Sequence, residues 1–368
     1  PPASVRIACY WYWISDNLSK EGMIRDLHAM KSAGIGRAYI GNIGLGAEGG
    51  TVKFGSEEWW EVVHTAMKTA TELDIELGMF NSPGWSQSGG PWIEPERAMR
   101  YLTSTKTMVE GGRPVNVTLA RPEGAYQDVK LLAYPVEYRA EPITLGGIIA
   151  NPELPEVKKL VDGDTGSGTA LAADEHGRLS LELALESEQT VRSLKIYTGD
   201  YSINTVAEFQ VREGEEYRQL AQFKLDRYNM ALNVGFKPRA PIVVSLPPTT
   251  AKDFRLVVHN AGAHTGLTEI ELSSMPYVER YPEKTLAKMF QEPLPYWHEY
   301  QWRQQPPVDD PSWVVDPARV LDLSAFLSGD QLAWDAPAGN WVILRMGATP
   351  TGVENAPASK EATGLEVD

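Results

Sequence analysis

Two tryptophans and an asparagine follow a short apolar segment and have the chemistry of a sugar-binding loop. Residues 75–80 predict a buried strand, and Asn81, Trp85 and Trp92 come after it in a segment rich in glycine, serine and proline. In parallel α/β folds, loops at the carboxyl ends of strands form the ligand site. An indole ring stacks on a sugar, and an amide bonds its hydroxyl groups. We therefore interpret these three residues as substrate-binding; the alternative is a structural loop whose two indole rings plug the end of a barrel.

Further candidates for chemistry lie near the two ends of the sequence. Glu366 and Asp368 alternate with apolar residues in a strand-like segment, and Glu354 lies in a loop. We interpret Glu366 and Asp368 as candidate catalytic groups and Glu354 as a substrate contact, although strand-end carboxylates also pair with neighbouring Lys or Arg. Trp11 and Trp13 end the first predicted strand and are further substrate-binding candidates. The alternative for both is core packing.

Composition excludes several classes of function. The 368 residues carry a formal net charge of −15, and Lys and Arg do not cluster, which disfavours binding to nucleic acid or to an anionic membrane surface. No apolar run has the length of a membrane span. With the single cysteine Cys9 no disulfide framework can form, and the six histidines lack the spacing of zinc ligands.

The first hundred residues alternate strand and helix patterns. The predicted strands span residues 5–14, 36–40 and 75–80, and the predicted helices span residues 20–33, 57–73 and a third beginning at 95–101. Ser19 and Ser56 are the predicted N-caps of the first two helices, and Gly34 ends the first. The buried face of the second helix is predicted to contain Trp60, Val63, Met67 and Ala70. Long loops follow strands and short turns follow helices, which favours a (β/α)₈ barrel over a doubly wound sheet.

The remaining sequence has a different pattern. Short alternating segments with turn signals between them predict a β-sandwich. These strands are predicted at 115–119, 131–134, 179–183, 191–196, 209–211, 242–246, 254–258 and 270–272. A helix is possible at 282–290, and 320–332 and 341–346 again have strand character.

The predicted fold class is α/β plus all-β, with a partial (β/α)₈ TIM-type barrel interrupted by an inserted antiparallel β-sandwich. Five segments follow from this division. They are the first β/α units at 1–103, a β linker at 104–156, the sandwich at 157–275, a Pro- and aromatic-rich connection at 276–340, and a truncated return to the barrel at 341–368.

Three blocks of sequence resemble glycoside hydrolase family 106, the α-L-rhamnosidase type. They are YWYW at 10–13 with DLHAMKSAGIG at 26–36, FNSPGW at 80–85 with GGPWI at 89–93, and LRMG at 344–347 with GLEVD at 364–368. The resemblance implies a barrel with inserted β domains, inverting hydrolysis of α-L-rhamnosides in a rhamnose-containing glycan, dependence on calcium, and a periplasmic or secreted bacterial enzyme whose signal peptide is not in this chain. It also implies that the main acid and base lie beyond Asp368, so we expect this chain to be an incomplete part.

A second resemblance lies within the sandwich. The segment 160–169, with 268–272, resembles the discoidin-like fold of family 32 carbohydrate-binding modules. The resemblance implies a Ca²⁺ site with Asp162, Asp164, Thr169 and Glu269 as ligands, and oxygen donors of this kind suit that ion. The alternative is an ordinary Asp-Gly turn beside a solvated glutamate. For the whole chain, the alternative to a hydrolase is a non-catalytic carbohydrate-binding protein.

Overall fold

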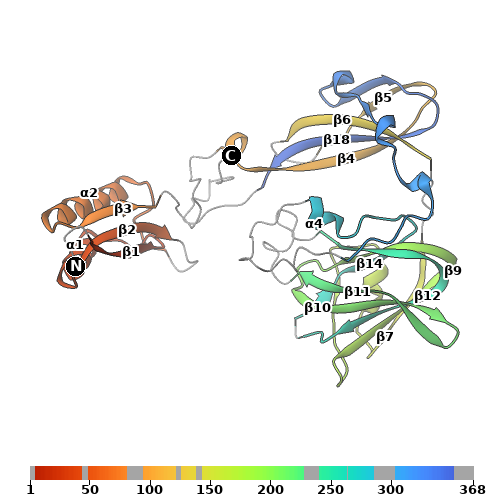
Figure 1. The fold of residues 1–368 in the computed structure, drawn as a ribbon, viewed down its shortest axis with the longest axis horizontal. Helices are drawn as coiled ribbons and strands as arrows, with labels where there is room; N and C mark the ends of the chain where they lie inside the picture. Colours follow the sequence, from red (N-terminus) through yellow and green to blue (C-terminus); the bar gives the residue numbers. More distant parts are fainter. Residues whose placement is uncertain are drawn as a thin grey trace. The chain divides into compact units, whose positions relative to one another are not determined.

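The computed structural model describes residues 5–43, 49–80, 94–121, 126–137, 143–227, 240–262, 264–285 and 303–351 (Figure 1). The chain divides into two compact units. The first comprises Pro1–Thr103, Pro122–Val129 and Gly347–Asp368, and the second comprises Ser104–Arg121 and Lys130–Met346. None of the helices within the described ranges has the length and apolar character that crossing a membrane requires.

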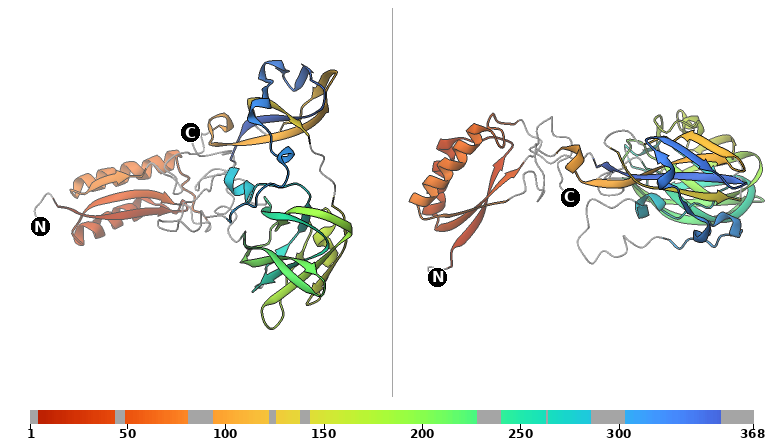
Figure 2. Two further views of the ribbon diagram at one scale, coloured as in Figure 1. Left: turned by 45° about the vertical axis from the view of Figure 1, so that its right-hand side comes forward. Right: turned by 90° about the horizontal axis from the view of Figure 1, so that it is seen from above.

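The first unit contains a small parallel sheet covered by two helices (Figure 2). β1 (Ile7–Ile14), β2 (Ile35–Ile43) and β3 (Glu76–Met79) pair in parallel in that order. α1 (Lys20–Ser32) joins β1 to β2, and α2 (Glu57–Glu72) joins β2 to β3. The helices pack against each other and share one apolar core with the sheet. The predicted alternation of strands and helices is therefore confirmed up to β3.

The ends of both helices are fixed by the residues that the sequence indicates. The Ser19 side chain accepts a hydrogen bond from the Gly22 N–H at 3.1 Å, and Ser56 accepts one from the Trp59 N–H at 3.2 Å. Gly34 has φ of 79°, a left-handed conformation that side chains rarely adopt. The predicted caps are confirmed.

The buried face of α2 differs from the prediction by a rotation of about one residue. Trp60 and Met67, predicted to be buried, are 47% and 55% exposed. Trp59 is buried instead, because its indole N–H donates to Asn42 Oδ1 at 3.0 Å and its ring meets the Phe54 ring edge-on at 4.8 Å. The buried positions are Trp59, Val62, Val63, Ala66, Thr69 and Ala70.

The predicted third helix is wrong. Only Pro95–Arg97 forms a single 3₁₀ turn, η2, and β4 (Arg100–Glu110) follows at once. The β4 sequence RYLTSTKTMVE contains four β-branched residues and lacks an apolar stripe at helical spacing, so it favours extended backbone. A proline near the start of a helix is compatible with a short turn as well as with a long helix.

The second unit contains the antiparallel sandwich, as predicted. Its main sheet has the strand order β11-β10-β12-β9-β14, and β7 pairs with β9. The bounds are β7 (Leu145–Asn151), β9 (Arg178–Tyr197), β10 (Ile203–Glu213), β11 (Glu216–Arg227), β12 (Ile242–His259) and β14 (Glu269–Ser273). The 3₁₀ turn η3 (Val157–Val161) and the short pair β8 (Thr169–Ala170) and β13 (Gly266–Leu267) complete it. Phe209 and Phe254 stack at 5.6 Å in its fully buried core.

Two smaller sheets carry the remaining strands. One has the order β15-β6-β18-β4 and the other has the order β16-β17-β5. The bounds are β5 (Pro114–Thr118), β6 (Gln127–Val136), β15 (Leu321–Asp322), β16 (Leu327–Ser328), β17 (Gln331–Asp335) and β18 (Asn340–Pro350). The turns η5 (Pro311–Trp313), η6 (Pro317–Arg319) and η7 (Ser324–Phe326) precede β16. The buried Arg345 links the two sheets, since its guanidinium donates to Asp330 Oδ1 at 2.9 Å and to the Leu119 carbonyl at 3.1 Å.

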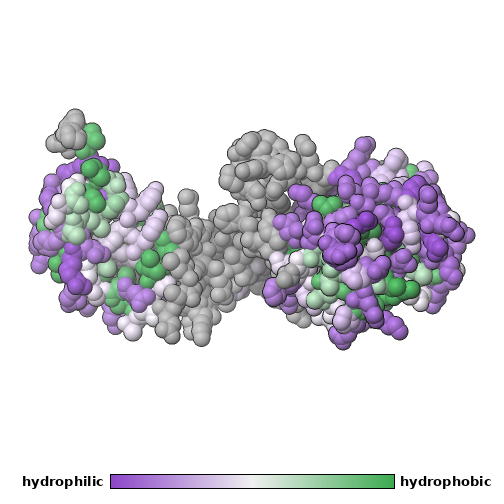
Figure 3. Space-filling model, turned by 90° about the horizontal axis from the view of Figure 1, so that it is seen from below, coloured by the Kyte–Doolittle hydropathy of each residue, from purple (hydrophilic) through white to green (hydrophobic). Residues whose placement is uncertain are grey.

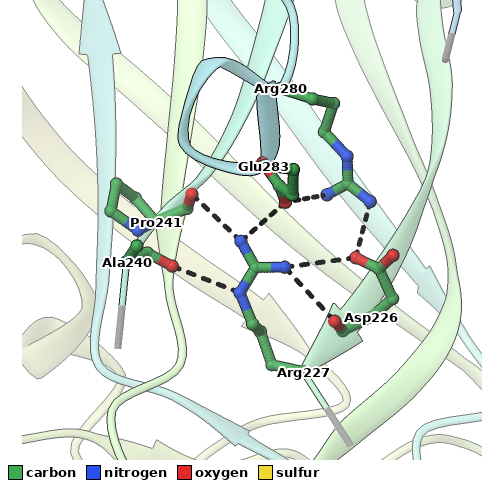
Figure 4. A network of polar contacts seen from close by, with 6 residues as sticks. All are labelled: Asp226, Arg227, Ala240, Pro241, Arg280 and Glu283. Carbon is green, nitrogen blue, oxygen red and sulfur yellow. Dashed lines mark hydrogen bonds and ion pairs between the residues drawn. The ribbon is translucent and has the colours of Figure 1, made fainter. Parts of the chain in front are cut away.

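A buried network of charges anchors the segment that leaves the sandwich (Figure 4). This segment includes α4 (Tyr281–Thr285), the described part of the helix predicted at 282–290. Arg227 of β11 pairs with Glu283 at 2.8 Å, and Arg280 pairs with Asp226 at 2.6 Å. Burial lowers the pKa of Arg227. Burial also opposes the charge on Arg280, but attraction by Asp226 and Glu283 raises the pKa of that group.

Candidate functional site

Most of the substrate-side candidates fall in segments that the structure does not describe. These residues are Asn81, Trp85, Trp92, Glu354, Glu366 and Asp368. Their roles in substrate binding and catalysis stay predictions.

Trp11 and Trp13 lie in the core between the parallel sheet and its helices. They are 6% and 2% exposed, and their rings meet edge-on at 5.5 Å. The Trp11 indole N–H donates to Asp26 Oδ2 of α1 at 3.0 Å, whereas the Trp13 indole nitrogen has no hydrogen-bond partner among the described residues. Both side chains are therefore packed in the core, which was the alternative to the interpretation of Trp11 and Trp13 as substrate-binding residues.

The opposite face of the same sheet has an aromatic surface that the sequence analysis missed. Tyr10 and Tyr12 alternate with the two tryptophans along β1 and are 65% and 40% exposed. The Tyr10 ring lies 5.8 Å from Tyr12, 6.4 Å from Tyr39 and 5.3 Å from Phe80. The alternation within YWYW was the available signal, because successive side chains of a strand point to opposite faces.

Two glycines let these rings lie across the sheet. A Cβ at Gly78 would stand 2.5 Å from the Tyr39 ring, and one at Gly41 would stand 3.0 Å from Phe80 and 3.2 Å from Tyr12. Side chains at these positions would push the rings away. Because parallel sheets are normally covered on both faces, this aromatic face, which no described element of the first unit covers, is a surface suited to a further layer or a ligand.

The predicted calcium ligands lie around one tight loop of the sandwich. Glu269 is only 3% exposed and its Oε2 accepts a hydrogen bond from the Gly163 N–H at 3.0 Å. Gly163 has φ of 84°, which lets the loop turn toward Glu269. Asp162 Oδ1 accepts from the Asp164 N–H at 2.9 Å. The loop and the distant glutamate are therefore brought together as expected.

The other two predicted ligands, Asp164 and Thr169, make hydrogen bonds to main-chain groups. Asp164 Oδ1 accepts from the Gly166 N–H at 2.9 Å, and the Thr169 hydroxyl donates to the Pro155 carbonyl at 2.8 Å. No group of three or more His, Cys, Asp and Glu side chains is placed to hold a metal ion within the described ranges. An ion here would need main-chain or hydroxyl oxygens besides Asp162 and Glu269, a donor set that is common for Ca²⁺.

The surroundings of Glu269 disfavour its charged form. Burial, with repulsion from Asp162 and Glu271, raises the pKa of Glu269 to about 7, although its bond from the Gly163 N–H opposes the shift. A buried carboxylate is stable in its charged form when a cation or several donors compensate it. The site therefore fits a hard cation, which would supply that charge.

Comparison with known proteins places the chain in a family. The model of glycoside hydrolase family 106, described as alpha-L-rhamnosidase, matches residues 1–368. The chain belongs to glycoside hydrolase family 106. This family 106 chain is also similar to the solved structure of a rhamnosidase from Novosphingobium sp. PP1Y, with a TM-score of 0.74 and 28% sequence identity. That similarity covers 100% of this chain and 35% of the other.

Two further similarities are more limited. A candidate β-glucuronidase of Formosa agariphila is 38% identical over 167 residues, which are 43% of this chain and 14% of that protein. The family 32 module of Clostridium perfringens NanJ, solved in complex with galactose, is similar at 14% identity with a TM-score of 0.29, and the similarity covers 35% of this chain and 93% of that module. The chain thus spans 35% of the length of the rhamnosidase, and its match to the candidate β-glucuronidase spans 14% of that protein.

Proposed function

We propose that the protein is a glycoside hydrolase that cleaves α-L-rhamnosides in a glycan with inversion at the anomeric carbon. The observation that carries this proposal is the match of the family 106 model over residues 1–368. The similarity to a rhamnosidase over the whole chain supports it. An inverting mechanism requires an acid and a base about 6.5–9.5 Å apart, with water between the base and the sugar. Glu366 and Asp368 remain our candidates within this chain.

We also propose that β1, β2 and β3 are the first strands of a (β/α)₈ barrel. Parallel order, with both helices on one face, supports a barrel, since its helices form an outer ring. The aromatic face with Tyr10 and Tyr12 would then be the inner one, where barrel side chains stack in layers. The loop after β3, which carries Asn81, would lie at the carboxyl end, where barrel enzymes bind their substrates.

The activity is tested with aryl glycosides. The natural gene product and the 368-residue chain are assayed separately with aryl α-L-rhamnoside and aryl β-glucuronide, because one relative is a candidate β-glucuronidase. Release of the aryl group from the rhamnoside alone supports the proposal. Cleavage of the glucuronide alone would replace it with that activity, and sugar binding without cleavage of either would favour the non-catalytic alternative.

Trp85→Ala is expected to weaken binding of a rhamnoside by about 1–3 kcal/mol, the range for removal of an aromatic anchor. The physical reason is the loss of stacking between the indole and the apolar face of the sugar. Titration calorimetry of the wild type and the variant, under conditions in which neither cleaves the rhamnoside appreciably, measures the change in binding free energy. Unchanged affinity in a folded variant would remove Trp85 from the site.

We further propose that Asp162 and Glu269 hold a structural Ca²⁺, with Asp164 and Thr169 near it. Chelation is expected to lower the free energy of unfolding by about 2–3 kcal/mol if calcium was present at roughly a hundred times its dissociation constant. Without metal, the raised pKa of Glu269 makes the folded state bind more protons than the unfolded state between about pH 4.3 and pH 7. Stability of the metal-free protein therefore falls as pH rises through this window.

Calcium reverses this trend because it binds the deprotonated carboxylate. The difference in melting temperature between calcium and chelator is thus expected to be larger at pH 8 than at pH 5. Glu269→Gln should abolish that difference, whereas Glu271→Gln, two residues along β14, should keep it. Identical melting curves in calcium and chelator at pH 8 would eliminate the site.

A further inference from the structure

A groove lies on the sandwich of the second unit, and Asp162 of the proposed calcium loop is at its edge. It has a volume of about 610 Å³ and is lined by β7, η3, β9, β10, β11 and β12. This volume lies within the range of about 300–1,000 Å³ that small-ligand sites occupy. Hydrophilic side chains cover much of the visible surface of the second unit in Figure 3. With its volume of about 610 Å³, the groove is large enough for part of a polar chain molecule.

Strand alternation explains which side chains face this groove. Leu183 and Phe254 are paired neighbours on β9 and β12, and both are buried in the core. Glu182 and Asp253, each one residue before them, therefore lie on the outer face of the sheet. On the neighbouring strand β7, Gly147 leaves the floor open, since a Cβ at this position would meet no atom within 4 Å.

One wall of the groove is an aromatic ring held in a fixed position. The Arg255 guanidinium lies 3.7 Å from the centre of the Tyr217 ring. Arg255 Nε donates to Gln210 Oε1 at 2.8 Å, and Gln210 Nε2 donates to Glu208 Oε2 at 2.9 Å. The Tyr217 hydroxyl is protonated at neutral pH, as in any tyrosine, and burial raises its pKa further. A ring held by such a chain of contacts is preorganised for a ligand.

Several charged groups that line the groove are free to bond a ligand. The side chains of Lys158, Glu182 and Asp253 line it and make no hydrogen bond or ion pair within the described part of the chain. Carboxylates accept from pairs of hydroxyl groups, and an ammonium donates to sugar oxygens. Asp162 is assigned to the proposed calcium site; the other charged lining groups are Lys158, Arg212, Glu182 and Asp253, two positive and two negative, with no net charge. This balance favours a neutral polyhydroxylated ligand over an anionic one.

We propose that this groove is a second carbohydrate site that binds a neutral oligosaccharide, with a pyranose ring against Tyr217 and hydroxyl pairs on Glu182 and Asp253. The choice of a rhamnose-containing chain as the probe rests on the proposed function. The site lies on the sandwich and would hold the glycan independently of the residues that cleave it.

The experiment is titration of the 368-residue chain by calorimetry with a short α-L-rhamno-oligosaccharide, a cello-oligosaccharide and an oligogalacturonate. Gly147→Val fills the floor of the groove without steric conflict and is expected to weaken binding of the neutral probes at least about tenfold. Tyr217→Ala is expected to have a similar effect. Gly262→Val, which also adds a side chain in open space but outside the groove, is the matched control. Melting curves verify that each variant is folded.

Binding of a neutral probe that Gly147→Val or Tyr217→Ala weakens, and Gly262→Val does not, supports the groove. The proposal is overturned if no neutral probe binds, if the anionic probe binds more tightly, or if both groove variants bind like the wild type. Hydrolysis of aryl α-L-rhamnoside by the natural gene product is recorded in parallel. Groove binding without hydrolysis would reject the proposed activity and keep the groove. Hydrolysis without groove binding would keep the proposed activity and reject the groove.

Discussion

Arg227→Met is expected to lower the free energy of unfolding by about 3–5 kcal/mol, the range for removing one partner of a buried ion pair. The guanidinium has no exposed surface and pairs with Glu283, whose side chain is 4% exposed. It also donates to the main-chain carbonyls of Ala240 and Pro241, each at 3.2 Å. The variant removes the bonds to these oxygens and leaves Glu283 with Arg280 at 3.4 Å as its remaining cation in the described structure. Urea unfolding measures the change.

The control is Arg218→Met, which breaks an exposed pair with Glu213. Both side chains of that pair are more than half exposed, so a loss below about 1 kcal/mol is expected. Equal stability of Arg227→Met and Arg218→Met would contradict the network described for the sandwich.

Trp59→Ala is expected to lower the free energy of unfolding of the first unit by about 3–5 kcal/mol, as for other buried aromatic residues. Its ring packs edge-on against Phe54 at 4.8 Å and Trp13 at 6.1 Å. The truncation would remove these contacts and leave Asn42 Oδ1, a buried acceptor, without its donor. Thermal unfolding followed by tryptophan fluorescence and circular dichroism reports the loss.

The neighbouring residue supplies a matched control. Trp60 is 47% exposed, and Trp60→Ala is expected to change stability by less than about 1 kcal/mol. Trp59→Phe keeps most of the packing and isolates the bond to Asn42, with an expected loss of about 1–2 kcal/mol. A larger effect at Trp60 than at Trp59 would mean that α2 packs in the register predicted from the sequence and not in the one observed.

Local signals in the sequence predicted the ends of helices better than their buried faces. Ser19 and Ser56 act through bonds to main-chain groups three residues away, so the sequence contains all partners of the interaction. Which of Trp59 and Trp60 is buried depends on Asn42, which lies in another element, and no spacing rule contains that information.

The strands of the sandwich illustrate a second limit. Turn-like residues predicted four separate strands at 179–183, 191–196, 242–246 and 254–258, whereas β9 and β12 each run continuously through both of their regions. The prolines at 247 and 248 fall at a register shift between Ser245 and Thr249, where the ladder is interrupted but the strand continues. For the candidate site, the sequence resemblance connected Asp162 with Glu269. The acids along the groove, Glu182 and Asp253, could not be connected from the sequence, because they lie on different strands and only the pairing of β9 with β12 brings them together.

The most direct test of the central claim is the configuration of the sugar that the natural gene product releases from an aryl α-L-rhamnoside, followed by proton NMR from the first minutes of the reaction. An inverting family 106 enzyme releases the β-anomer first, and the α-anomer grows only as the free sugar mutarotates. Initial release of the α-anomer would contradict the proposed mechanism. Absence of any cleavage of the rhamnoside by a folded, calcium-loaded protein would contradict the proposed activity itself.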